Sequence, residues 1–386
     1  MKLAKRMDAL VPGIFTELAR ARAEKEKTGT SVIDLSIGSP DLPPAPHIIH
    51  SLAQAVMKLD NYTYPISGKL ALHKALADWY KQRFNVELDP NKEILTLMGS
   101  QDGLAHVAQA FINPGDIALV PDPGYPIYSA AILLAEGQLY PMPLLEENQY
   151  LPDLQSIPDE IAKKAKMMTL NYPNNPVAAS ANKEFFEQVV EFAKKYDIVV
   201  CHDVAYAELA FDGFRPMSFL EVAGAKDIGI EFYSLSKTYN MAGCRIGFAL
   251  GNADILAALG KIKSNIDYGV FSAVQEAGIA ALTGDQSCVA QTAATYQKRR
   301  DILVDGFAKL GWQMPKPQAS MFIWAPIPPG HTSSMEFCLD LLDKTGILMV
   351  PGNAFGKRGE GYVRIALVQK EEVLREALER ARSFFL

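Results

Sequence analysis

One stretch decides the fold, Ser234-Leu-Ser-Lys237-Thr-Tyr-Asn-Met-Ala-Gly243-Cys-Arg245, and it overlaps the end of the run Ile230-Glu-Phe-Tyr-Ser-Leu. The run alternates apolar and polar residues as a half-buried strand does, which predicts that Lys237 lies at the carboxyl end of a strand. Open α/β sheets bind their ligands at that edge. Two hydroxyls precede the lysine and a guanidinium follows it. This combination suits an anionic phosphate bound beside an amine nucleophile.

Two other apolar runs end in polar residues that fit the same chemistry. Ile198-Val-Val-Cys-His-Asp203 reads as a strand that ends in an acid, and Tyr206 follows three residues later. Asn175 lies in a polar turn after Met167-Met-Thr-Leu. A carboxylate at a strand end can keep a pyridine nitrogen protonated, while a phenol and an amide can hydrogen-bond the ring oxygen. Together with Lys237 as covalent anchor, these residues indicate a site for pyridoxal 5'-phosphate.

The ordered set of motifs resembles that of the fold-type I pyridoxal phosphate aminotransferases of class I/II. The motifs are Pro-Asn-Asn175-Pro, Asp203-x-x-Tyr206, Ser234-x-Ser-Lys237 and Arg245-Ile-Gly, and the match extends from Ile37-Gly38 to Gly361-Tyr-Val-Arg364. Leu-Ser-Lys-Thr-Tyr-Asn-Met-Ala-Gly-x-Arg and Pro-Asp-Pro-Gly-Tyr125-Pro resemble the branch that contains alanine, LL-diaminopimelate and methionine-forming aminotransferases.

Two positions depart from the common family pattern. Asn175-Pro-Val177-Ala178 stands where the family usually has Asn-Pro-Thr-Gly, and Cys244 replaces the usual Trp before the phosphate arginine. Neither change removes an expected cofactor contact. Both bear on the shape of the local loops and therefore on substrate fit.

The regular alternation of apolar strands with helices from 167 to 250 predicts an α/β protein with parallel strands and crossover helices. The resemblance implies a large pyridoxal phosphate-binding domain, residues 45–283, with a mostly parallel seven-stranded sheet between helices. Beyond residue 283 the composition changes, which predicts a smaller α+β domain formed by residues 1–44 and 284–386. A short strand is expected over residues 31–37 and a helix over 47–59.

The residues expected to contact the cofactor phosphate and ring are inferred from their places at strand ends and from the family resemblance. Strand Ile94–Met98 runs into Gly99-Ser100-Gln101-Asp102-Gly103 and then a helix, an arrangement that presents free N–H groups. The resemblance implies that Ser100 and Gln101 contact the phosphate together with Ser234, Ser236 and Arg245. Tyr125, at the end of another buried strand, is the expected aromatic stacking partner of the ring. A plain helix cap and simple loop packing are the alternatives for these two segments.

The substrate contacts are expected from Gly38, Asn175 and Arg364. Arg364 lies among apolar residues of a strand, where a buried guanidinium needs an anionic partner such as a substrate α-carboxylate. A structural ion pair and an ordinary turn glycine are the alternatives for Arg364 and Gly38. In the family a tyrosine of a neighbouring subunit completes the phosphate site, so a homodimer is expected. The spacing leaves Tyr62 and Tyr64 open, and Tyr64 is the one we select.

The predicted function is an aminotransferase that moves an amino group between an L-amino acid and a 2-oxo acid. Lys237 is expected to hold the cofactor and move the proton, Asp203 to keep the ring protonated, and Tyr206 to bond the ring oxygen. Glutamate and 2-oxoglutarate are expected as one pair, with alanine, LL-diaminopimelate or methionine as the partner. The alternatives are a β carbon–sulfur lyase, an acyl-transferring synthase or a non-catalytic regulatory protein that keeps the fold.

The composition of the chain argues against other classes of protein. The chain has 386 residues, 49% of them apolar, and a formal charge of −6, which argues against a nucleic-acid partner. The cysteines lie far apart without a Cys-x-x-Cys motif, so neither a metal site nor a disulfide framework is expected: Cys201, Cys244, Cys288 and Cys338. No apolar run approaches the ~20 residues that span a bilayer. We therefore expect a cytoplasmic protein without membrane or metal partners.

Overall fold

The computed structural model describes residues 2–10 and 14–386. Its centre is a seven-stranded sheet, and only one of the seven strands, β8, runs antiparallel to its neighbours. This confirms the prediction of a mostly parallel sheet. The strands follow one another in the order β2 (Ile94–Leu97), β8 (Gly247–Gly251), β7 (Gly229–Ser234), β6 (Val199–Asp203), β5 (Ala165–Asn171), β3 (Ile117–Asp122) and β4 (Gln138–Pro143).

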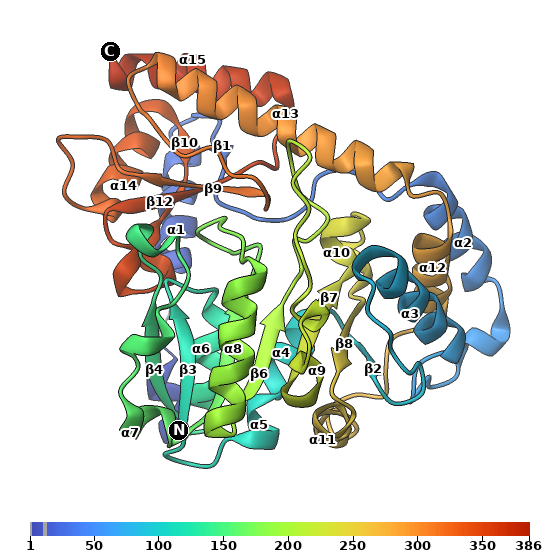
Figure 1. The fold of residues 1–386 in the computed structure, drawn as a ribbon. Helices are drawn as coiled ribbons and strands as arrows, with labels where there is room; N and C mark the ends of the chain where they lie inside the picture. The colour runs from blue at the N-terminus through green and yellow to red at the C-terminus, as the bar shows by residue number, and fades with distance from the viewer. Residues whose placement is uncertain (1, 11–13) are drawn as a thin grey trace.

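Helices cover both faces of this sheet (Figure 1). One face packs on α3 (Leu70–Phe84), α8 (Lys183–Tyr196), α9 (Ala225–Ile228) and α12 (Ser272–Thr283). The other face packs on α4 (Ser100–His106), α5 (Ala108–Phe111), α6 (Pro126–Leu134) and α11 (Ala253–Lys263). The remaining helices of this unit are α2 (Pro46–Val56), α7 (Asp159–Ala162) and α10 (Leu235–Thr238).

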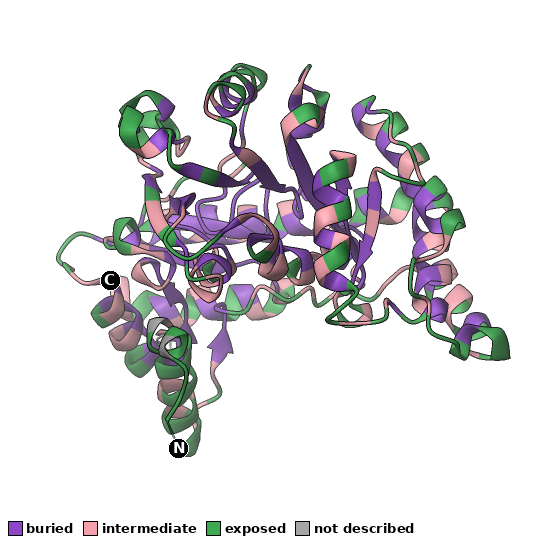
Figure 2. Ribbon diagram, turned by 90° about the horizontal axis from the view of Figure 1, so that it is seen from below, coloured by how far each residue is buried: buried purple, intermediate pink, exposed green. Residues whose placement is uncertain are grey.

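The alternation of side chains along each strand produces the two layers. In β7, Phe232 points into the layer under α4 while the next residue, Tyr233, points into the layer under α3. Figure 2 shows this burial along the strands, with exposed residues on the outer faces of the helices. The sheet is therefore buried on both faces, as crossover helices require.

A smaller unit is formed by the two ends of the chain. It holds the antiparallel sheet β11 (Val350–Pro351), β12 (Tyr362–Ala366) and β9 (Phe322–Pro326), and the parallel pair β1 (Ile33–Asp34) and β10 (Ile347–Leu348). Its helices are α1 (Ile14–Lys27), α13 (Ser287–Lys309), α14 (Ser334–Thr345) and α15 (Glu371–Phe385). Most of these elements share one apolar cluster, which also takes in Tyr206 and Phe211, while α1 and β11 pack in a second, smaller cluster. The predicted domain boundaries at residues 45 and 284 stay a prediction.

Two expected elements are shorter than the sequence predicted. The strand over 31–37 contains only Ile33–Asp34, because the Asp34 carboxylate accepts hydrogen bonds from the Ser36 amide at 2.8 Å and hydroxyl at 2.6 Å and turns the chain. The helix over 47–59 ends at Val56. No helix among the described residues is both long and apolar enough to cross a membrane.

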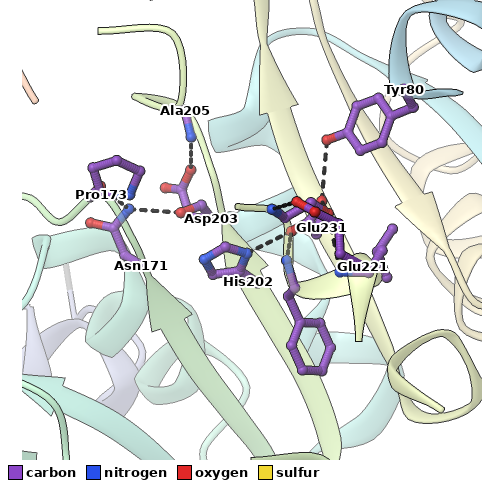
Figure 3. Close-up of polar contacts among 11 residues, drawn as sticks. Tyr80, Asn171, Pro173, His202, Asp203, Ala205, Glu221 and Glu231 are labelled. Atoms are coloured by element: carbon purple, nitrogen blue, oxygen red, sulfur yellow. Dashed lines mark hydrogen bonds and ion pairs between the residues drawn. The ribbon is translucent and has the colours of Figure 1, made fainter. Parts of the chain in front are cut away.

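A fully buried polar cluster connects β6 and β7 on the face of the sheet opposite Asp203 (Figure 3). The Glu231 carboxylate accepts hydrogen bonds from the His202 ring at 2.7 Å, the Ser218 hydroxyl at 2.6 Å and the Phe219 amide at 2.7 Å. The Tyr80 hydroxyl adds a fourth at 3.2 Å. His202 therefore packs beneath the sheet, as strand alternation predicts, and is remote from the reacting groups.

We predict that Glu231→Leu lowers the free energy of unfolding by about 3 kcal/mol. The substitution leaves four buried donors, the His202 ring among them, without a hydrogen-bond acceptor. Urea unfolding followed by circular dichroism measures the loss. Glu187→Leu is the control, since Glu187 forms only an exposed ion pair with Lys183 at 3.4 Å and its removal changes stability by about 0.5 kcal/mol or less. Equal effects of the two variants would contradict this role for the cluster.

Candidate functional site

A cavity of about 620 Å³ lies where the carboxyl ends of the large-sheet strands meet the smaller unit. Every site residue expected from the sequence lines it except Tyr64. The expected residues in its wall are Gly38, Ser100, Gln101, Tyr125, Asn175, Asp203, Tyr206, Ser234, Ser236, Lys237, Arg245 and Arg364. Residues that the sequence did not single out, among them Phe15, Tyr128 and Phe322, complete the wall.

Lys237 enters the cavity from α10, immediately after β7. The Ser234 hydroxyl caps this short helix by accepting the Ser236 amide at 3.1 Å, which fixes the turn on which the lysine stands. The Lys237 ammonium donates to the Gly38 carbonyl at 2.7 Å. Burial and the charges of Arg364 and Arg245 lower the pKa of Lys237 to about 8, against an opposing effect of Asp203. The amine is therefore prepared to act as a nucleophile near neutral pH.

Asp203 ends strand β6 and lies buried beneath the cavity. Its carboxylate accepts the Tyr128 hydroxyl at 2.8 Å and the Ala205 amide at 3.2 Å. The Asn171 side chain donates to its backbone carbonyl at 2.8 Å, which fixes the strand end (Figure 3). Burial raises the pKa of Asp203, and the two donors only partly oppose this rise. No lysine, arginine or histidine in the described ranges forms an ion pair with this carboxylate, so a cationic ring nitrogen placed here would supply a positive partner.

Tyr128 is a functional contact that sequence reasoning missed. It lies in the first turn of α6, three residues after Tyr125, the N-cap residue of that helix, and its ring meets the Tyr125 ring edge to face at 5.8 Å. The Tyr125 hydroxyl donates to the Gln101 side chain at 3.2 Å. The sequence signal for it was weak, because Tyr125 precedes the helix in an extended conformation and only Tyr128 lies in it.

Arg364, on β12, is buried, and no acidic side chain in the part of the chain that the structure describes pairs with it. Its guanidinium donates to the Asn175 side-chain oxygen at 2.9 Å and to the Ser36 carbonyl at 2.6 Å, while its Nε has no hydrogen-bond partner among the described residues. Burial lowers the pKa of Arg364 to about 10. The described residues therefore do not form the structural ion pair that was the alternative for Arg364. A buried guanidinium with a spare donor suits a carboxylate ligand.

Two aromatic rings hold the Arg364 side chain in place. The Phe322 and Phe355 rings lie 4.2 Å and 4.6 Å from its guanidinium carbon. Gly38 is confined by the same packing, since a Cβ there would lie 2.5 Å from the Phe322 ring. Neither phenylalanine was expected from the sequence, because no local pattern connects residues 322 and 355 with residue 364.

Away from Arg364, the cavity wall contains a second group of residues suited to an anion. Arg245, in the left-handed region with φ 52°, donates to the Ala242 carbonyl at 3.0 Å and lies against the turn that begins α4. Gly99 has φ 82°, and a Cβ there would lie 2.5 Å from the Arg245 guanidinium. Glycine is needed at this contact for both reasons. Ser100 and Gln101 follow directly and line the same cavity as Arg245, so N–H groups at the start of α4 and a guanidinium are available to a phosphate there.

Tyr64 is the one expected residue that the cavity does not include. Its side chain is 77% exposed and packs on the Tyr268 ring at 5.0 Å. Within one subunit it contacts none of the other site residues described above. Its expected role depends on a second subunit.

The cavity has groups suited to a phosphate, a cationic ring and a carboxylate around one amine. Comparison with known proteins points to the same kind of site. A family model described as aminotransferase class I and II matches residues 30–380.

The chain belongs to the class I and II aminotransferase family.

Relatives with curated names are similar over nearly their full lengths. The LL-diaminopimelate aminotransferase of Syntrophobacter fumaroxidans is 53% identical over 98% of this chain and 98% of its own. That of Moorella thermoacetica is 50% identical over 99% of this chain and 98% of its own. A solved structure described as substrate-bound BacF from Bacillus subtilis has a TM-score of 0.96 and 39% identity, covering 100% of this chain and 98% of its own. This class I and II aminotransferase is a pyridoxal phosphate-dependent transaminase, and the lyase and non-catalytic alternatives are not favoured.

One departure from the family pattern has a structural consequence. Ala178, where the family usually has glycine, adopts φ 58°. This left-handed conformation favours glycine, so this aminotransferase keeps the loop shape at a local steric cost. Val177, in place of the usual threonine, is buried in a cluster with Trp324. The loop beside Asn175 is thus held by apolar packing.

The lowered pKa of Lys237 predicts a pH dependence for the cofactor-free aminotransferase. Only the neutral amine is nucleophilic, so the rate of its reaction with trinitrobenzenesulfonate rises with pH and reaches half its maximum near pH 8. Ordinary lysines titrate near ~10.4. Arg364→Gln removes a nearby positive charge and moves the midpoint upward. Peptide mass spectrometry of residue 237 measures the rate, and a midpoint above pH 10 in the unmodified chain would contradict the assignment.

Proposed function

We propose that this enzyme transfers an amino group between LL-diaminopimelate and 2-oxoglutarate. The observation that carries this choice of substrate is the name shared by curated relatives at about half identity over nearly the whole chain. Solved structures with other names, such as the probable N-succinyldiaminopimelate aminotransferase of Thermus thermophilus, are less similar at 37% identity. A cytoplasmic location is part of the proposal, supported by four cysteines that form no disulfide.

The residue roles belong to the same proposal. Bound pyridoxal phosphate supplies the aldehyde that captures the amino group and a cationic ring that accepts electrons. Lys237 anchors it and then moves a proton from the substrate Cα through its Nζ. Asp203 holds the proton on the ring nitrogen, and Tyr128 orients the Asp203 carboxylate. Tyr206 and Asn175 donate to the ring oxygen, and Tyr125 stacks on the ring.

The two anionic groups are bound at opposite ends of the cavity. Ser100, Gln101, Ser234, Ser236 and Arg245 hold the phosphate. Arg364 binds the substrate α-carboxylate, and the peptide of Gly38 lies beside it. The separation of these two anion sites fixes which end of the substrate approaches Lys237.

A panel of amino donors tests the substrate. With 2-oxoglutarate as acceptor, we expect kcat/KM for LL-diaminopimelate to exceed that for alanine and methionine by at least about tenfold, because polar groups of a cognate site discriminate strongly. Glutamate formation is the measurement. A preference for alanine or methionine would overturn the substrate, and release of pyruvate and ammonia from the donor would indicate a lyase.

We also propose a homodimer in which Tyr64 reaches the neighbouring phosphate. Exposed aromatic residues of two loops pair with each other, Tyr62 with Phe271 at 5.3 Å and Tyr64 with Tyr268 at 5.0 Å, and form an apolar surface. The Tyr62 hydroxyl already donates to the Val56 carbonyl at 2.9 Å. The Tyr64 hydroxyl makes no hydrogen bond to the described residues of its own subunit. This difference supports Tyr64 as the donor to a second subunit.

The pair Tyr64→Phe and Tyr62→Phe tests this choice. We expect Tyr64→Phe to weaken pyridoxal phosphate binding by about tenfold, the value of one hydrogen bond to a charged group, and Tyr62→Phe to change it by less than about threefold. Equilibrium dialysis measures affinity and analytical ultracentrifugation checks the dimer. The reverse order of effects would show that Tyr62 is the donor.

A further inference from the structure

Lys263 is a buried lysine outside the cavity, with only 5% of its surface exposed. It ends α11 and lies between two carboxylates. Its ammonium donates to Asp102 at 2.9 Å and to both oxygens of Asp267 at 2.7 and 2.5 Å. A buried cation with two acids leaves one negative charge to be carried by the cluster.

Asp102 connects this cluster with the phosphate end of the cavity. It directly follows Ser100 and Gln101, which line the cavity, whereas its own side chain points away from it. Its carboxylate also accepts the Met98 amide at 3.0 Å and contacts the His106 ring at 2.9 Å. Burial alone would raise the pKa of Asp102, but the hydrogen bond and charge of Lys263, with the hydrogen bonds from Met98 and His106, together keep the pKa below its usual value. Asp102 is therefore an anion beside the place where a phosphate is to bind.

An uncompensated Asp102 would repel the phosphate. Two like charges within one helical turn interact strongly in a partly buried site, where screening by solvent is weak. Arg245 faces the phosphate side of the turn and is exposed, so it does not neutralise Asp102. In the described part of the chain, the only lysine or arginine in contact with the Asp102 carboxylate is Lys263.

The same lysine also fixes a second loop. Asp267 accepts the Gly269 amide at 2.6 Å, and Gly269 packs directly against the Pro65 carbonyl, next to Tyr64. The cluster thus joins the start of α4 to the two loops that carry Tyr64 and Tyr268. The cluster therefore lies between the turn at the phosphate end of this subunit's cavity and the loops whose Tyr64 is proposed to reach the neighbouring subunit.

We propose that Lys263 is a positioning residue for cofactor binding, which neutralises Asp102 so that the phosphate end of the cavity accepts a dianion. The proposal rests on the pyridoxal phosphate-dependent function given above. It concerns the phosphate alone, so the ring and the aldehyde are unaffected.

Comparison of two ligands separates this role from a general structural one. Pyridoxal and pyridoxal 5'-phosphate share the ring and the aldehyde and differ only in the phosphate. For Lys263→Met we expect the Kd of pyridoxal 5'-phosphate to rise by at least about tenfold, a change of about 1.4 kcal/mol. The Kd of pyridoxal should change by less than about threefold. The visible absorbance of the ligand bound to full-length protein is the measurement.

Adding Asp102→Asn to Lys263→Met removes the repelling charge and should restore the affinity for pyridoxal 5'-phosphate to within about threefold of the unmodified chain. Lys226→Met is the matched control, because Lys226 forms an ion pair with Glu93 at 3.0 Å on the surface away from the cavity. This control should change neither Kd.

Equal losses for both ligands in Lys263→Met, or no rescue by Asp102→Asn, would overturn the proposal. If Lys263→Met does not fold, the double variant decides, and a tenfold loss confined to the phosphorylated ligand would refute the role of charge. Failure of the unmodified chain to bind pyridoxal 5'-phosphate would instead contradict the proposed function.

Discussion

The arrangement of the site depends on an imbalance of charge in one cavity. Lys237, Arg245 and Arg364 supply three positive groups, while Asp203 is the one acid among the described residues of the wall. The cations repel each other, which is part of the reason that the pKa of Lys237 lies near 8. A phosphate at one end and a carboxylate at the other remove this repulsion. The protein is thus complementary to two anions before either is bound.

The chain topology explains how distant residues reach this cavity. The parallel strands β5, β6 and β7 end at the same edge of the sheet, so Asn175, Asp203 and Lys237 follow one another around it. Arg364 belongs to the smaller unit and crosses to Asn175 of the large one. The carboxylate site that we propose therefore lies where the two units meet. Ligand binding at the junction is typical of sites formed by two structural units.

The part of the site that lies at strand ends could be predicted from the sequence, because the signal is local. Asp203 and Lys237 each end an apolar run, and strand periodicity correctly directs His202 to the other face. Phe322 and Phe355 could not be predicted in this way, since only tertiary packing brings them to Arg364. The strand around Asp34 was overestimated because a side chain competes for the backbone.

A segment of three residues contacts both the Lys237 ammonium and the Arg364 guanidinium. The Ser36 carbonyl accepts from Arg364 at 2.6 Å, and the Gly38 carbonyl accepts from Lys237 at 2.7 Å. In an amino acid, one carbon atom separates the amino nitrogen from the carboxylate. Two carbonyls of one short segment bind both cations, so the two groups that an amino acid would meet in the proposed function contact the same three residues. Gly38 is required for this, because any side chain would displace Phe322 and, with it, Arg364.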